Sequence, residues 1–189
     1  MPQFDKLVLT DKGRDLRAKA ETGVTLQFTR MAVGDGELNG QELKELESLI
    51  SERASLDIVS MNVIGNGTSR VRAAIDNHDL ESGYYVREIG LFAQDPDVGE
   101  ILYSVANAGD KADYMPAYSG SEIVESIIDL ITVVGDAQEV TAVIDESLVY
   151  VTVRDLLEQE KVYLNDPDTG QRIAFGLSNN RLYYEEVTE

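Results

Sequence analysis

The 189-residue chain has no cysteine, no tryptophan and a single histidine, His78. Without cysteine there are no disulfides, thiolate metal ligands or thiol nucleophiles. With one histidine, a metal site would need carboxylates or carbonyls for its other ligands. The serines of Ser82-Gly83 and Ser119-Gly120-Ser121 lack a histidine in register and the G-x-S-x-G turn of a nucleophile. We therefore expect no catalytic residues, no metal site and no cofactor.

Basic residues are also scarce, since 16 lysines and arginines stand against 35 acidic residues, which gives a formal charge of −19. Such a charge repels nucleic-acid phosphates and anionic lipid, so neither is an expected partner. No stretch approaches the roughly twenty apolar residues that a membrane-spanning helix needs. Residues 1–6 lack the cationic and apolar segments of a secretory signal, which favours synthesis and assembly in a cytoplasm.

Acidic residues are plentiful, but they define no site. Segments 95–99 and 166–170 both have the sequence Asp-Pro-Asp-x-Gly. Their alternating carboxylates match the first positions of a calcium loop, yet the later ligands and the bidentate glutamate are missing, so turn chemistry explains both segments. An enzyme that cleaves polysaccharide would need two carboxylates about 5–10 Å apart in a cleft. The sequence singles out no such pair.

Two segments of the first half are predicted to be helices. Thr10-Asp11 is a suitable N-cap for Lys12–Ala20, which is rich in helix-forming residues. In Gln41–Glu52 apolar residues recur every three or four positions, which predicts a helix with one apolar face that covers a sheet. The apolar positions are Leu43, Leu46, Leu49 and Ile50.

Alternating patterns predict strands over most of the chain. Tyr84–Phe92 and Ile101–Val105 form the clearest pair, because the turn between them contains proline, glycine and carboxylates. The first of these strands is apolar on both faces, as in a strand buried on two sides or at a subunit contact. Asn66-Gly67 is a strong hairpin signal. Further strands are predicted at Val24–Val33, Leu56–Val63, Ser69–Ile75, Ile123–Val134 and Val140–Ile144.

The region from residue 110 to residue 134 is harder to interpret. Asp110–Ser121 is polar, contains Pro116 and Gly120, and is predicted to be an exposed loop. Ile123–Val134 is apolar on both faces, which indicates an interior position. Within it, Glu125–Ile131 is also compatible with a helix.

The predicted fold is α+β, a mostly antiparallel β-sheet with two packed helices, followed by a short helix and a small β appendage. The predicted domains are residues 1–150 and 151–189. In the second, Val153–Glu160 is the short helix, and Lys161–Val187 contains three short strands. Such a small unit needs a partner surface to be stable.

Four segments, in this order along the chain, resemble the phage tail-collar fibre family. The resemblance extends over roughly the first four-fifths of the chain. The segments are Leu9-Thr10-Asp11-Lys12-Gly13, Phe28–Gly36 (FTRMAVGDG), Tyr85–Ala93 (YVREIGLFA) and Ile144–Tyr150 (IDESLVY).

The resemblance implies a structural virion protein and not an enzyme. In that family the region anchors a tail fibre or receptor-binding component to the baseplate of contractile-tailed phages and phage-like particles. A homotrimer in the virion tail, assembled in the host cytoplasm, is implied, with a baseplate protein and a fibre or receptor-binding protein as partners. The alternative is a short receptor- or glycan-binding tail protein that uses the C-terminal β unit. The roughly forty residues after Tyr150 are too few for an extended fibre.

The tyrosines and one charged pair are the candidates for interface residues. Nine tyrosines stand against four phenylalanines, and a tyrosine ring can be buried while its hydroxyl stays in water. Arg87 and Glu88 either lie in water on an edge strand or bridge to neighbouring chains or the baseplate. The tyrosines could equally pack over strands of their own domain. The candidates are Tyr85, Arg87, Glu88, Tyr114, Tyr118, Tyr183 and Tyr184.

Overall fold

The computed structural model describes residues 4, 6–120, 123–144, 162–165, 172–178 and 181–187. The chain divides into two compact units, Met1–Ser147 and Leu148–Glu189. The described elements of the first unit are β1 (Val8–Leu9), α1 (Asp11–Glu21), β2 (Leu26–Gly34), η1 (Leu43–Glu45), β3 (Glu52–Leu56), β4 (Ile58–Gly65), β5 (Thr68–Asp76), β6 (Tyr84–Val86), β7 (Glu88–Asp95), β8 (Gly99–Asn107), η2 (Gly109–Lys111), β9 (Asp113–Met115), β10 (Glu125–Val133) and β11 (Val140–Ala142). Those of the second unit are β12 (Val162–Asn165), β13 (Arg172–Ser178) and β14 (Arg181–Val187), which form one antiparallel sheet.

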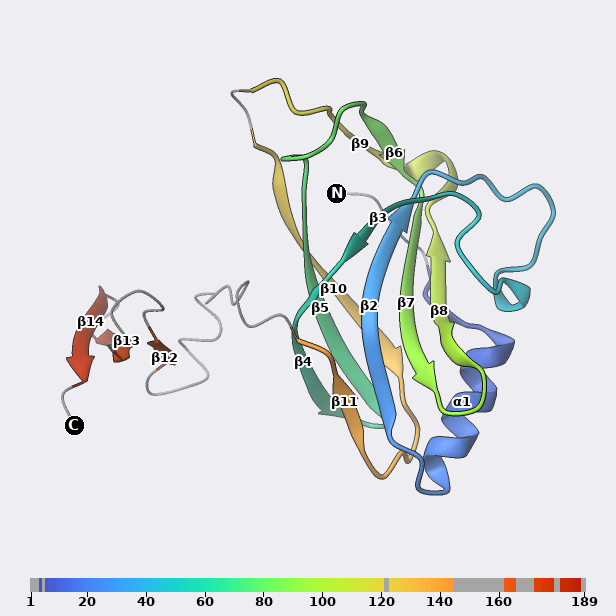
Figure 1. Ribbon diagram of the computed structural model, residues 1–189, viewed down its shortest axis with the longest axis horizontal. Coiled ribbons are helices and arrows are strands. Elements are labelled where there is room, and N and C mark those ends of the chain that lie inside the picture. Colours follow the sequence, from blue (N-terminus) through green and yellow to red (C-terminus); the bar gives the residue numbers. More distant parts are fainter. Residues whose placement is uncertain are drawn as a thin grey trace. The chain divides into compact units, whose positions relative to one another are not determined.

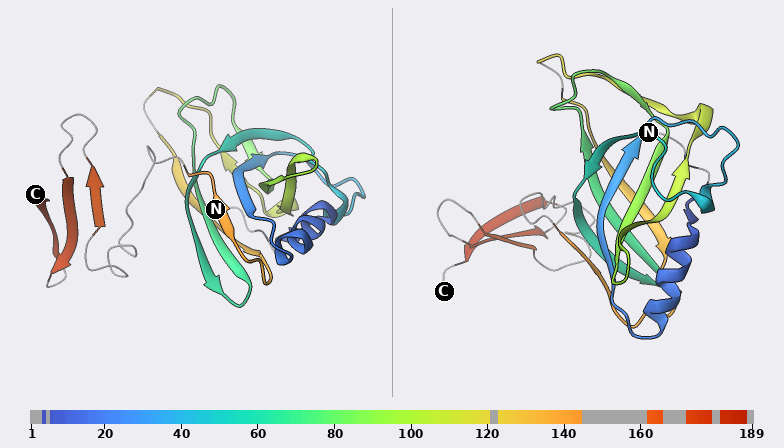
Figure 2. Two further views of the ribbon diagram at one scale, coloured as in Figure 1. Left: turned by 60° about the horizontal axis from the view of Figure 1, so that its bottom comes forward. Right: turned by 45° about the vertical axis from the view of Figure 1, so that its right-hand side comes forward.

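Two sheets make up most of the first unit (Figure 1). The larger has the order β1-β8-β7-β2-β11, and β3 pairs with the second half of β2. The smaller has the order β10-β5-β4, and both of its pairs are antiparallel. Figure 2 shows the two sheets as layers with α1 beside the larger one. Phe28, Val71 and Leu130, from β2, β5 and β10, belong to one buried cluster, so the main core lies between the layers.

Helix α1 begins where its sequence predicts, because Thr10 caps it. The Thr10 hydroxyl accepts a hydrogen bond from the Gly13 N–H at 2.9 Å and donates one to the Leu102 carbonyl at 2.5 Å. The Thr10 N–H donates to the Tyr103 carbonyl at 3.0 Å. These bonds join the start of the helix to β8. Leu16 of the helix is fully buried in the main core.

The predicted hairpins are confirmed. β4 and β5 are joined by Asn66-Gly67, whose φ angles of 51° and 66° are the positive pair that a type I′ turn requires. β7 and β8 pair from the Asp95 and Gly99 positions onward. β10 is a strand and not a helix, since it pairs with β5 along its whole length.

The predicted α+β class with two packed helices is wrong. In the part of the chain that the structure describes, α1 is the one helix of seven or more residues, so the fold is mostly antiparallel β with a small helix. Gln41–Glu52 forms a single 3₁₀ turn, Leu43–Glu45, before β3 begins. The short helix predicted at Val153–Glu160 lies outside the described residues.

A tertiary contact explains the missing second helix. The N–H groups of Ile50 and Ser51 donate to the Glu88 carboxylate at 3.0 and 2.9 Å, whereas a helix would direct them to carbonyls four residues earlier. Leu49 is still buried against the larger sheet, next to Phe92. The apolar spacing therefore predicted that Leu43, Leu46 and Leu49 pack on the sheet, but it was wrong for Ile50, which is exposed, and it did not predict the backbone conformation.

The strand predicted at Tyr84–Phe92 is divided at Arg87. Its first part, β6, pairs with β9, whereas β7 lies between β2 and β8. β9 belongs to the segment predicted to be an exposed loop, and Met115 within it is buried. That loop is therefore partly a strand.

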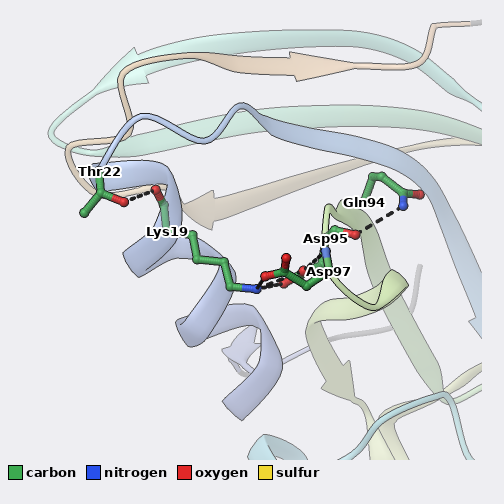
Figure 3. A network of polar contacts seen from close by, with 5 residues as sticks. All are labelled: Lys19, Thr22, Gln94, Asp95 and Asp97. Carbon is green, nitrogen blue, oxygen red and sulfur yellow. Dashed lines mark hydrogen bonds and ion pairs between the residues drawn. The ribbon is translucent and has the colours of Figure 1, made fainter.

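An ion cluster connects α1 to the β7–β8 turn (Figure 3). The Lys19 ammonium donates to both carboxylate oxygens of Asp95, at 2.9 and 2.8 Å, and to Asp97 at 2.7 Å. The Asp97 N–H also donates to Asp95 at 2.8 Å. Lys19 thus binds both carboxylates of segment 95–99, whose spacing resembles the first positions of a calcium loop.

This cluster shifts the pKa values of Lys19 and Asp95. The hydrogen bond to Asp95 is the main reason that the pKa of Lys19 is raised above 10.5. Burial alone would raise the pKa of Asp95, but the Lys19 hydrogen bond and the N–H groups of Asp97 and Val98 outweigh it and lower the pKa below 3.8. The contribution of Asp95 to the free energy of unfolding is therefore lost as the pH falls below 3.8. The contribution of Lys19 is lost as the pH rises above 10.5.

Replacing Lys19 by methionine is expected to lower the Tm by a few degrees at pH 7, because Asp95 then remains a buried carboxylate without its cation. The difference from the unmodified protein should shrink as the pH falls below 3.8 and Asp95 becomes protonated. Thermal unfolding from pH 2 to pH 9, followed by circular dichroism, measures this. Lys12→Met, which removes an exposed pair with Glu47, is the control and should show little change at any pH. A loss of Tm in Lys19→Met that is independent of pH would contradict stabilisation through the ion pair with Asp95.

Candidate interaction surfaces

Tyr85 and Tyr114 form an exposed aromatic pair on the two-stranded β6–β9 sheet. The two residues are direct cross-strand partners, and their ring centroids lie 5.2 Å apart at an interplanar angle of 59°. The residues are 49% and 56% exposed. Strand alternation explains the geometry, because the flanking Tyr84 and Val86 point the other way and are buried.

Arg87 extends this aromatic surface. Its guanidinium carbon lies 5.2 Å from the centre of the Tyr85 ring, which is cation–π range, and it also pairs with Glu37 at 3.2 Å. The Arg87 N–H donates to the Gly34 carbonyl at 2.9 Å, which fixes the backbone at the junction of β6 and β7. We call Tyr85, Arg87 and Tyr114 the aromatic platform.

Glu88 does not belong to this surface, because its side chain is fully buried. Its carboxylate accepts hydrogen bonds from the N–H groups of Gly36 at 3.1 Å, Ile50 at 3.0 Å and Ser51 at 2.9 Å. The sequence suggested that Glu88 either lies in water or bridges to another chain, and the structure shows neither. Its role is internal, since it fixes both ends of the β2–β3 connection on the end of β7.

The other tyrosine candidates are on other segments of the chain. Tyr118 is 37% exposed and stacks on His78, with ring centroids 5.4 Å apart. Tyr183 and Tyr184 lie on β14, opposite Gly176 and Phe175 of β13, and their side chains are outside the described part of the chain.

An apolar cavity of about 260 Å³ opens beside Tyr114. Its volume is below the roughly 300–1,000 Å³ of typical small-molecule sites. Among the described residues that line it, Asp113 is the single carboxylate, whereas hydrolysis of a glycosidic bond requires two. The cavity suits an apolar side chain from a protein partner. Its lining residues are Phe4, Ile75, Val86, Asp113, Tyr114, Met115, Val124, Ser126 and Ile128.

A second surface, which the sequence did not reveal, is the outward side of the β10-β5-β4 sheet. Leu130 and Thr132 of β10 are buried, so the residues that alternate with them point outward. Ile131 and Val133 are 53% and 46% exposed there. The apolar pattern on both faces of Ile123–Val134 was the available signal, but it was interpreted as an interior position. We define the outer face by the following outward residues of β5 and β10: Arg70, Arg72, Asp76, Glu125, Ile127, Asp129, Ile131 and Val133.

Neither a metal centre nor a membrane helix is found in the described residues. Within them, no group of three or more His, Cys, Asp or Glu side chains could hold a metal ion. No helix among them combines the length and the apolar character needed to span a bilayer. What the first unit does present is a mostly β scaffold with exposed aromatic and apolar surfaces, which is typical of a domain that functions through contacts with other proteins.

Comparison with known protein families agrees with a domain that functions through contacts with other proteins. Residues 1–154 match the family described as phage tail-collar fibre protein, N-terminal, and the chain belongs to this family. The resemblance seen in the four sequence segments is thereby confirmed. Searches of curated proteins and of solved structures gave no match. The chain is thus a structural protein of a phage tail fibre and a component of the virion tail.

The fold also shows where three of the four resembling segments lie. Phe28–Gly36 and Tyr85–Ala93 pair as β2 and β7, and they meet at the buried Glu88 carboxylate. Leu9–Gly13 forms the capped start of α1 against β8. Most of the fourth segment, 144–150, lies outside the described residues.

Proposed function

We propose that this chain anchors a fibre or receptor-binding component to the tail baseplate of a contractile-tailed phage or phage-like particle, as a homotrimer. The family match over residues 1–154 is the observation that carries this proposal. Most of the separate unit Leu148–Glu189 lies beyond the matched region, and this unit is the part that leads toward the fibre or its partner.

The aromatic platform is the surface that we assign to the baseplate protein. Tyrosine and arginine are enriched at the energetic centres of protein interfaces, and here two tyrosines and Arg87 are adjacent. The neighbouring apolar cavity provides a concave site for one side chain of the partner. Since β6 and β9 form only a two-stranded sheet, a docked partner would also stabilise them.

Replacing both Tyr85 and Tyr114 by serine is expected to weaken attachment to the baseplate about tenfold or more, because truncating interface tyrosines commonly costs over 1 kcal/mol each. Tail particles assembled without this protein are incubated with the purified full chain and sedimented. The bound fraction is then quantified by immunoblot.

Val98→Ser is the matched control, because Val98 is 68% exposed in the β7–β8 turn, away from the platform. It should bind like the unmodified chain, and both variants should keep its Tm, since the replaced side chains are exposed. Unchanged binding of the double variant would remove the platform as the docking surface. Failure of the unmodified chain to bind would refute baseplate anchoring itself.

A further inference from the structure

Asparagine is followed by glycine at two places in the chain, Asn39-Gly40 and Asn66-Gly67. In such a pair the glycine nitrogen can attack the side-chain carbonyl carbon of the asparagine, because glycine has no side chain to block the approach. Both asparagines are exposed to water. The backbones of the two pairs are held very differently, so their reactivity depends on the fold.

Asn39-Gly40 lies in an exposed part of the β2–β3 connection, where residues 37–42 all face water. The Asn39 side-chain NH2 donates to the Glu37 carbonyl at 3.3 Å, and the Asn39 N–H donates to the Gln41 side chain at 2.6 Å. Among the described residues, no group accepts a hydrogen bond from the Gly40 N–H. A Cβ at Gly40 would meet no atom within 4 Å. The Gly40 nitrogen is therefore free to approach the Asn39 side chain.

Asn66-Gly67 is held in the type I′ turn between β4 and β5. The Gly67 carbonyl also accepts hydrogen bonds from the N–H groups of Val134 at 2.8 Å and Gly135 at 3.0 Å. For the Gly67 nitrogen to reach the side chain, the Asn66 backbone must rotate away from its turn conformation. That rotation would break these bonds and the end of the hairpin, so Asn66 reacts only in molecules whose turn has opened.

We propose that Asn39 is a site of spontaneous deamidation in the folded chain. The Gly40 nitrogen forms a bond to the Asn39 Cγ, the Cγ–Nδ2 bond breaks, and ammonia leaves with the proton that the Gly40 nitrogen loses. Water then adds to either carbonyl of the cyclic imide and gives aspartate or isoaspartate. The product has an additional carboxylate two residues from Glu37, which pairs with Arg87 of the aromatic platform.

The test follows both asparagines in the purified full chain, which is incubated in mildly alkaline buffer, digested with trypsin and measured by mass spectrometry. Cleavage after lysine and arginine places Asn39 in the peptide Met31–Lys44 and Asn66 in the peptide Ala54–Arg70. Fragmentation spectra identify the residue at which NH2 is replaced by OH. The same incubation in urea, which unfolds the chain, measures both rates without tertiary structure. Asn39→Gln is the matched control, because the longer side chain would have to close a larger ring.

We expect Asn39 to deamidate about tenfold or more faster than Asn66 in the folded chain, since only Asn66 requires an opening of the structure. In urea the two rates should become comparable, and Asn39→Gln should abolish the mass gain of the first peptide. Equal rates in the folded chain, or no reaction at Asn39, would overturn the inference. A preference for Asn39 that is equally large in urea would also overturn it, because local sequence would then decide the rates.

Discussion

Replacing Glu88 by alanine should destabilise the first unit by about 3 kcal/mol or more, because three N–H donors lose their shared acceptor. Each unsatisfied buried donor costs about 1–3 kcal/mol. In a chain of this size, such a loss lowers the Tm by roughly 6–12 °C. The stability of Glu88→Gln should lie between those of Glu88→Ala and the unmodified protein. The glutamine amide keeps one acceptor oxygen, but its NH2 group replaces the other oxygen and faces a backbone N–H that needs an acceptor.

Hydrogen exchange distinguishes this account from a general loss of packing. In Glu88→Ala, the amides of Gly36, Ile50 and Ser51 should lose protection before those of β2 and β7 do. Glu81→Ala removes an exposed carboxylate and is the control, which should change the free energy of unfolding by less than about 0.5 kcal/mol. If Glu88→Ala unfolds at the same temperature as the unmodified protein, the carboxylate does not hold the two ends of the β2–β3 connection.

Replacing Gly13 by alanine should also destabilise the protein, by about 3 kcal/mol, although alanine usually stabilises a helix relative to glycine. A Cβ at position 13 would lie 2.0 Å from the Tyr103 carbonyl oxygen. Since that oxygen accepts the Thr10 N–H bond, neither partner can move without breaking the contact between α1 and β8. The cost of overpacking therefore exceeds the gain in helix propensity.

Asp15→Ala is the matched helix control for this effect. Asp15 is exposed on α1, so alanine there should leave the stability unchanged or raise it slightly. Urea unfolding of the two variants measures both free energies. Equal or higher stability of Gly13→Ala would mean that the helix does not pack so closely on β8.

Elements with a local signal were predictable from the sequence. Thr10 caps α1 through a group three residues away, and Asn66-Gly67 can adopt the dihedral angles of its turn without help from the rest of the chain. The β7–β8 hairpin likewise follows from its own turn residues. The family, too, was recognisable from four short segments.

The candidate surfaces were only partly predictable. Alternation within β6 indicated that Tyr85 points away from Tyr84, but the pairing with Tyr114 depends on a strand, β9, that the sequence indicated as a loop. The outer face appeared as apolar residues on both sides of one strand. Sequence alone does not say whether such a strand lies inside one chain or between two.

The sequence by itself therefore determined the local elements of this protein, namely the capped helix, the hairpins and the alternating strands. Tertiary structure alone decided the conformation of Gln41–Glu52 and the place of Glu88. The physical reason is distance along the chain, since the N–H groups that surround the Glu88 carboxylate come from 37, 38 and 52 residues away. Their combined hydrogen bonds to one buried charge outweigh the helix propensity of the segment that provides two of them.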